Sequence, residues 1–153
     1  GQASVQATPL MMAMVAATVA NKGEQMTPYL VSRTLDPDLN EVSSTSTKVA
    51  RTPIDSATAS SLSSLMQTAV AEGTGTSAQV SGVQVAGKTG TAETGTDSGP
   101  TTWFVGFAGT DIDKPEIALA VVLDGNAETE DGATGGKIAG PVAAQVIDAA
   151  VNQ

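Results

Sequence analysis

The sequence predicts an α+β fold in which a three-strand antiparallel meander is covered by helices. Three β-prone segments follow one another along the chain, at about 83–93, 102–109 and 116–124. The connections between them, 94–100 and 111–115, are too short for a helix, so neighbouring strands must run antiparallel. Segments with helical signals lie before and after these strands, and such helices bury their apolar faces by packing on a sheet. Aromatic residues make up only 3% of the chain, so we expect small side chains and close packing between the layers.

The first helix is predicted to begin at Pro9 and to end near Gly23. Thr8 is a typical N-cap, proline is favoured at the first helical position, and glycine supplies the left-handed residue that follows a helix. The residues expected on its core face are Leu10, Met14, Val15 and Val19, with Met11 and Met12 as flexible core filler.

A hairpin and a second helix are predicted next. Residues 29–35 are β-prone, 36–38 form a turn, and 42–49 return as a second strand. Asp55 is expected to cap a helix that ends at Gly73. Its core face, spaced as in an amphipathic helix, is Leu62, Leu65, Met66, Ala69 and Val70.

A final helix is predicted after the sheet. An acidic, Gly-rich loop at 125–137 leads to Pro141, where the helix opens. Its expected core face is Val142, Val146, Ile147 and Ala150. No internal repeat and no linker interrupts the sequence, so residues 1–153 are expected to form one unit.

Charge and composition exclude several classes of function. The chain has 16 acidic and 7 basic residues and a net charge of −9, which argues against binding to nucleic acid or to anionic lipid. Because there is no Cys and no His, thiol chemistry and Ser-His-Asp catalysis are excluded and a zinc site is not expected. We expect no metal and no cofactor, with any acid–base chemistry coming from Lys, carboxylates or hydroxyls. No apolar run reaches the roughly 20 residues of a membrane span.

The candidate site is a K-T-G sequence within the first predicted strand of the meander. Lys88, Thr89, Gly90 and Thr91 place a cation, two hydroxyls and a residue without a side chain on one extended segment. In a strand, Lys88 and Gly90 point to one face and the two threonines to the other, and a twisted edge strand lets both sets border a cleft. Gly90 would let a substrate backbone approach closely, and the ammonium would attract a substrate carboxylate. The alternative is an ordinary surface strand with a solvated lysine, since three-residue patterns recur by chance.

A second pattern overlaps this segment. Residues 82–89 match the phosphate-binding pattern G-x-x-x-x-G-K-T, and 117–124 resemble an apolar strand ending in the Asp that would hold Mg²⁺. A P-loop needs a buried strand before its first Gly and a helix that starts at the Lys. Here 74–81 are polar, and the residues after Lys88 are rich in Gly and Thr, which disfavours a helix. A P-loop NTPase is therefore a remote alternative.

Seven segments, in one order, carry a resemblance to a known family. The chain resembles the transpeptidase domain of class B penicillin-binding proteins, the monofunctional enzymes that cross-link peptidoglycan. Residues 86–93 are similar to the family's A-G-K-T-G-T-A-E and 103–108 to its W-F-V-G-F-A, where Trp103 and Phe104 are expected to pack the strand and not to touch substrate. The other segments are 1–2 with 7–13, 20–23, 28–31, 72–78 and 135–142. The resemblance spans nearly all 153 residues, with Met11 standing where Gln is usual, and implies part of the penicillin-binding protein/serine β-lactamase-like transpeptidase fold.

The resemblance implies roles for individual residues. In the family, the Ser of an S-x-x-K motif attacks the penultimate D-Ala of a stem peptide and forms an acyl-enzyme, and β-lactams mimic that substrate. Lys88 would be the K-T-G lysine, which assists proton transfer beside the Ser of an S-x-N motif. Thr89, Gly90 and Thr91 would border the carboxylate of the substrate or antibiotic. The backbone N–H of Thr91 would form half of the oxyanion hole, so Lys88 and Thr91 are the expected catalytic residues.

Neither S-x-x-K nor S-x-N occurs in these 153 residues. The chain is therefore expected to be the C-terminal part of a transpeptidase domain, inactive alone, with the nucleophile upstream of Gly1. An upstream anchor would hold it at the extracytoplasmic face of a bacterial membrane. Expected partners are the D-Ala-D-Ala stem peptide, β-lactam antibiotics and the upstream part of the domain, with a membrane glycosyltransferase as a further candidate. A non-catalytic β-lactam sensor or scaffold of the same fold, and a serine β-lactamase, are the alternatives.

Overall fold

A three-strand antiparallel sheet forms the centre of the protein. The computed structural model describes residues 5–93, 99–125 and 132–152. Strands β5 (Gln84–Ala92), β6 (Thr101–Gly109) and β7 (Ile117–Leu123) lie in the order β5-β6-β7, and both pairs are antiparallel. The predicted meander is therefore confirmed, while most of the turn expected at 94–100 falls outside the described residues.

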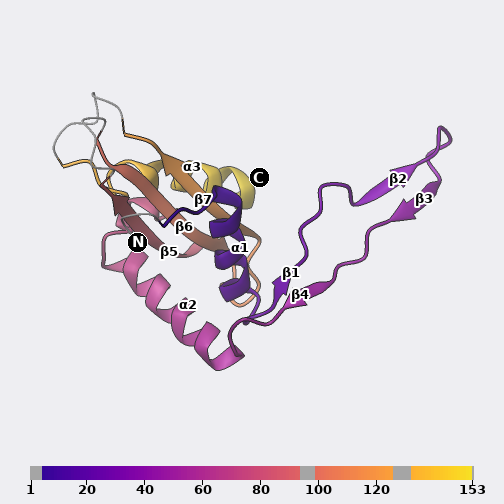
Figure 1. Ribbon diagram of the computed structural model, residues 1–153, viewed down its shortest axis with the longest axis horizontal. Coiled ribbons are helices and arrows are strands. Elements are labelled where there is room, and N and C mark those ends of the chain that lie inside the picture. The colour runs from indigo at the N-terminus through magenta and orange to yellow at the C-terminus, as the bar shows by residue number, and fades with distance from the viewer. Residues whose placement is uncertain (1–4, 94–98, 126–131, 153) are drawn as a thin grey trace.

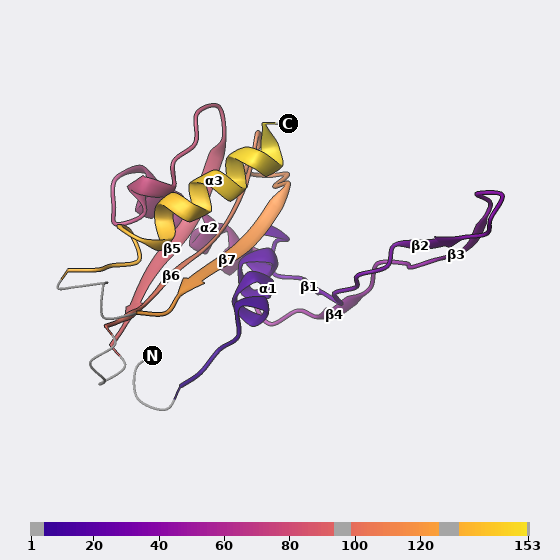
Figure 2. The same cartoon turned by 90° about the horizontal axis from the view of Figure 1, so that it is seen from above.

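Helices cover both faces of this sheet. Helix α1 (Pro9–Ala20) packs against β6 and β7 on one face, and α3 (Ala139–Val151) packs against the same two strands on the other, as Figures 1 and 2 show. Helix α2 (Ser56–Ala71) packs against β5, and a short 3-10 helix, η1 (Thr76–Ala78), lies against α3. This is the predicted α+β arrangement of helices on an antiparallel sheet. None of the helices in the described part of the chain is both long and apolar enough to cross a membrane.

The alternation of β6 divides the core into two clusters. Phe104 is fully buried in the cluster on the α3 side, together with Ile147. Phe107 is fully buried in the cluster on the α1 side, together with Ala16 and Val19. Successive strand residues point to opposite faces of the sheet. Phe104 and Phe107 are three positions apart, an odd number, so they lie on opposite faces.

The face of α1 that meets the sheet differs from the predicted one. Leu10 and Val15 are 62% and 48% exposed, and Met11 is exposed as well, so their assignment to the core is wrong. The buried residues of the helix are Ala16, Thr18 and Val19. Almost every position of α1 is apolar, so spacing alone does not select a face, and small side chains give the closest approach to the strands.

Helices α2 and α3 also bury smaller residues than expected. The buried residues of α2 are Ala59 and Val70. Of the predicted core face, Leu62, Leu65, Met66, Ala69 and Val70, only Val70 is therefore buried, and Leu65 is 67% exposed. Helix α3 begins at Ala139, two residues before the predicted start at Pro141. It buries Ala139, Gly140, Ala143 and Ile147, whereas Val142, Val146 and Ala150 are exposed. The buried side of each helix is mainly the side that carries Gly and Ala, because these residues allow close contact with the sheet. The spacing of large apolar residues does not predict that side.

A long hairpin projects from the body of the protein (Figures 1 and 2). Near its base, β1 (Gln25–Met26) pairs with β4 (Val49–Arg51), and further out β2 (Arg33–Leu35) pairs with β3 (Glu41–Ser44). Of the two predicted strands, 29–35 and 42–49, only the parts near the turn are paired, as β2 and β3. The inner pair of β1 and β4 lies almost wholly outside the predicted ranges. The turn at 36–38 is confirmed, because the Asp36 carboxylate accepts the backbone N–H groups of Asp38 and Asn40, both at 2.9 Å.

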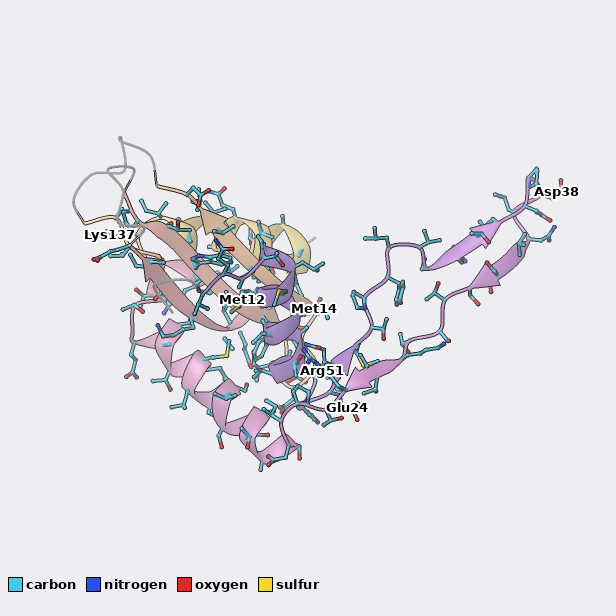
Figure 3. The ribbon with its side chains drawn as sticks, in the orientation of Figure 1. Met12, Met14, Glu24, Asp38, Arg51 and Lys137 are labelled. Atoms are coloured by element: carbon cyan, nitrogen blue, oxygen red, sulfur yellow. The ribbon has the colours of Figure 1, made fainter. Side chains whose placement is uncertain are left out.

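Polar contacts fix the base of this hairpin to α1. The Arg51 Nε donates to the Gln25 side-chain oxygen at 2.7 Å, and the Gln25 amide donates to the Thr18 hydroxyl at 3.3 Å. Figure 3 shows Arg51 and Glu24 at this base and Asp38 at the far tip. Gln25 and Thr18 are both buried, so their polar atoms need these partners.

We predict that Ile147→Ala destabilises the chain by roughly 2–5 kcal/mol, because it opens a cavity in a fully buried position. The matched control is Val146→Ala, whose parent side chain is 42% exposed and should lose less than about 1 kcal/mol. Urea unfolding followed by circular dichroism measures both values. Equal losses at the two positions would contradict the face assigned to α3.

A second prediction concerns pH and the N-cap of α2. The Asp55 carboxylate accepts the Thr58 backbone N–H at 2.7 Å, and this hydrogen bond lowers the pKa of Asp55 below 3.8. Stabilisation by the carboxylate is therefore present above that value and is lost as the pH falls through the lowered pKa. Asp55→Asn keeps a capping side chain without the charge.

Thermal unfolding of wild type and Asp55→Asn should be compared between about pH 5 and about pH 2. The unfolding temperature of the wild type should fall more steeply than that of the variant over this range. A difference between the two proteins that stays constant with pH would show that the Asp55 charge does not stabilise α2.

The candidate active-site strand

The predicted site residues lie in the second half of β5 and separate onto its two faces. Lys88 and Gly90 point to the face of α1, where a Cβ added to Gly90 would meet Trp103 Cβ at 3.3 Å. Thr89 and Thr91 point to the face of α3. The alternation predicted from the sequence is confirmed, and the four residues share one strand but two different surroundings.

On the α1 side, residues 88–92 of β5 form one wall of a groove of about 520 Å³. Its other walls are apolar side chains of α1, α2 and β6, namely Met12, Val15, Leu62, Met66, Trp103 and Val105. Figure 3 shows Met12 on the part of α1 that faces the sheet. Phe104 is buried in the core as expected, whereas Trp103 is half-buried and lines the groove. Val15 of α1 and Leu62 of α2 are therefore exposed because they line this groove, whereas Leu10 and Leu65 do not border it.

The peptide groups of the two threonines face the free edge of β5. In an antiparallel pair, residues that bond the neighbouring strand alternate with residues whose N–H and C=O point away from it. Gly90 pairs with Trp103, and the Gly90 N, the Gly90 carbonyl oxygen and the Trp103 carbonyl oxygen all lie within 3 Å of the position of a Cβ on Gly135, so the peptide groups of Gly90 point to β6. Thr89 and Thr91, one residue to either side, therefore belong to the second set. The Lys88 Nζ donates to the Thr89 carbonyl at 2.8 Å. Because β5 ends the strand order, these groups lie along an edge with no neighbouring strand among the described residues. Such an edge offers backbone donors to a ligand.

On the α3 side, both hydroxyls are hydrogen-bonded to residues outside the motif. The Thr89 and Thr74 hydroxyl oxygens lie 2.6 Å apart. The Gly135 backbone N–H donates to the Thr91 hydroxyl at 3.1 Å. Thr74 precedes η1 and Gly135 precedes α3, so two loops distant in sequence meet at this strand.

Gly135 and Gly136 allow this meeting because neither has a side chain. A Cβ on Gly135 would lie 2.5 Å from the Gly90 carbonyl oxygen and would also collide with the Trp103 carbonyl. A Cβ on Gly136 would collide with the Thr74 carbonyl. The Ser77 hydroxyl donates to the Gly136 carbonyl, which ties η1 to the same segment. Close backbone approach thus fixes the position of the Lys88–Thr91 strand.

Sequence reasoning missed this support. From the sequence, residues 74–77 and 125–137 are predicted only as loops. The contacts of the Thr74 hydroxyl and the Gly135 N–H with β5 are therefore not expected. The sequence does carry a sign of these contacts, because the segments 72–78 and 135–142 are both rich in small residues. Their glycines mark places where two backbones come together.

The geometry rules out the nucleotide-binding alternative at this segment. A P-loop would place Lys88 at the start of a helix, whereas β5 runs as a strand from Gln84 to Ala92. The residues from Gly82 to Thr89 therefore do not form a loop around a phosphate.

Comparison with known proteins identifies the family. A family model described as "Penicillin binding protein transpeptidase domain" matches residues 1–148. The chain belongs to this family. It is 39% identical to the peptidoglycan D,D-transpeptidase PbpA of Mycolicibacterium smegmatis, over 100% of this chain and 31% of that protein. It is 41% identical to PbpA of Mycobacterium tuberculosis strain H37Rv, over 99% of this chain and 30% of that protein. The resemblance to class B penicillin-binding proteins is confirmed.

A solved structure supports the same membership. Penicillin-binding protein A of M. tuberculosis, as its ceftriaxone acyl-enzyme complex, matches with a TM-score of 0.85 and 40% identity. The match covers 98% of this chain and 34% of that one. The transpeptidase fold predicted from the sequence is thereby confirmed. The chain spans about a third of the length of the relatives it matches.

We predict that Gly135→Ala destabilises the chain by more than about 2 kcal/mol, since the added Cβ meets two backbone carbonyls that have little room to move. Gly82→Ala is the control, because Gly82 has a φ of +77° but nothing within 4 Å of an added Cβ. It should lose only the roughly 1–2 kcal/mol of a left-handed conformation. If urea unfolding gives equal losses for both, the close approach of Gly135 to β5 is not needed for stability.

Proposed function

We propose that this chain forms one wall of the active site of a peptidoglycan D,D-transpeptidase that works through a serine acyl-enzyme and binds β-lactams. The observation that carries the proposal is the free edge of β5, where Lys88 stands on one face and the hydroxyls of Thr89 and Thr91 on the other. A cation, two hydroxyls and backbone donors around one edge suit a peptide that ends in a carboxylate.

In the proposed reaction, a serine Oγ attacks the carbonyl carbon of the penultimate D-Ala. The new C–O bond forms as the peptide C–N bond breaks, the serine proton passes to the leaving nitrogen, and the terminal D-Ala departs. An amine from another stem peptide then takes the acyl group and releases the serine. With a β-lactam, the ring C–N bond opens and the nitrogen stays tethered, so the adduct persists.

Residues of this chain would act at three points. The ammonium of Lys88 would assist proton transfer at the serine and attract the substrate carboxylate. The hydroxyls of Thr89 and Thr91 would donate to that carboxylate, and Gly90 would let the substrate backbone lie close to the strand. The outward N–H of Thr91 would stabilise the oxyanion, and one such donor is worth roughly 3 kcal/mol.

The nucleophile would come from an upstream part of the same protein, because these 153 residues contain no S-x-x-K. That part would fill the apolar groove beside Lys88 and complete the domain. We place the whole protein at the extracytoplasmic face of a bacterial membrane, held by an upstream anchor, with a membrane glycosyltransferase as its candidate partner. The relatives named PbpA are called peptidoglycan D,D-transpeptidases, which supports this assignment.

The test is intact mass after incubation with penicillin, for this chain and for the polypeptide extended upstream. Only the extended form should gain the mass of the antibiotic. Lys88→Ala should slow the acylation about 100-fold or more, since general acid–base groups typically contribute that much. Lys114→Ala, in the turn between β6 and β7, is the control and should acylate like the wild type.

Other outcomes separate the alternatives. An adduct on neither form would leave the non-catalytic sensor or scaffold as the better account. Rapid loss of the adduct with release of hydrolysed antibiotic would favour a serine β-lactamase. An adduct on the short chain would show that the nucleophile is one of its own residues.

A further inference from the structure

The hydroxyl of Thr74 lies behind the proposed carboxylate-binding strand and has no role so far. Its oxygen is 2.6 Å from the Thr89 hydroxyl oxygen, a distance typical of a good O–H···O hydrogen bond. Either oxygen could be the donor in this pair. The direction of the bond decides what Thr89 presents to a ligand.

Backbone contacts hold Thr74 in this place. Directly after it, the Gly75 N–H donates to the Ala69 carbonyl at 3.0 Å, which ties the segment to the last turn of α2. Gly136 lies so close to the Thr74 carbonyl that no side chain would fit between them. Ser77 donates to Gly136 from the other side of the same loop. The position of the Thr74 hydroxyl is therefore set by two packed loops.

The two threonines of the motif are supported in a similar way. A hydroxyl has one proton to donate and two lone pairs that accept. The Thr91 hydroxyl already accepts the Gly135 N–H, so its own proton stays free for a ligand. If Thr74 donates to Thr89, the proton of Thr89 is free as well. If the bond ran the other way, Thr89 would turn a lone pair toward an incoming carboxylate, which is repulsive.

We propose that Thr74 is a positioning residue that orients the Thr89 hydroxyl as a donor toward the substrate carboxylate. This inference rests on the proposed function, because it assumes that a carboxylate binds along β5. Thr74 does not touch the substrate; it acts through Thr89. Its effect therefore falls on the recognition of a free carboxylate and not on the chemistry at the serine.

The test uses the upstream-extended polypeptide and two probes, penicillin G and its methyl ester, in which a methyl group removes the carboxylate charge. The measured quantity is the second-order rate constant of acylation, followed by intact mass. Thr74→Val should lower this constant for the free acid about tenfold, the usual scale for losing one hydrogen bond to a charged group, and leave the ester nearly unchanged. Thr74→Ser keeps the hydroxyl and should restore the preference for the acid.

Thr76→Val is the matched control, since Thr76 is exposed at the start of η1, two residues after Thr74, and should leave both constants unchanged. Thr74→Ala removes the same hydroxyl and replaces Thr74→Val if that variant fails to fold. In a Thr89→Val background, the Thr74 substitution should add no further loss, because its only route to the ligand is gone.

Three results would overturn the proposal. Equal losses for acid and ester would mean that Thr74 only supports the fold. No change for either probe would mean that Thr89 needs no orienting partner. Wild-type polypeptide that acylates with neither probe would refute the proposed function itself, and the role of Thr74 would fall with it.

Discussion

The close approach of Gly135 and Gly136 to β5 is the constraint on which the candidate site depends. Gly135 lies against the backbone of Gly90, and its N–H donates to the Thr91 hydroxyl. Gly136 lies against the loop of Thr74, whose hydroxyl meets that of Thr89. The segment that precedes α3 therefore supports one face of the strand, and the groove walled by α1 and α2 borders the other face. A side chain at Gly135 would collide with the backbones of β5 and β6, and a side chain at Gly136 would collide with the Thr74 carbonyl.

Small side chains also make up most of the buried residues in the rest of the protein body. The sheet places one large aromatic residue in each layer, Phe104 and Phe107. Most of the buried helix residues that meet the sheet are Ala, Gly or Thr, and Val19, Val70 and Ile147 are the larger ones. Larger apolar residues of α1 and α2 lie instead around the groove beside Lys88. Ala16, Val19 and Met66 belong to both the core cluster and the groove, so packing and the candidate site share part of the same helix faces. The long hairpin adds polar contacts at its base but contributes nothing to the two core clusters.

Much of this arrangement could be predicted from the sequence, for identifiable reasons. Short connections fixed the antiparallel meander, the N-caps Thr8 and Asp55 located two helix starts, and period-2 alternation separated Lys88 from Thr89. The buried faces of the helices could not be predicted, because α1 is apolar on every side and the decisive contacts are made by Ala and Gly. The pairing of Thr74 with Thr89 could not be predicted either, since it joins loops far apart in sequence.

The proposed function requires a carboxylate ligand to lie along the outer edge of β5, on the side of its hydroxyls. The most direct measurement is a crystal structure of the upstream-extended protein acylated by penicillin. We expect the antibiotic carboxylate within hydrogen-bonding distance of the Thr89 and Thr91 hydroxyls, and the acyl carbonyl oxygen on the Thr91 N–H. A carboxylate bound instead in the groove beside Trp103, with both hydroxyls turned away, would contradict it.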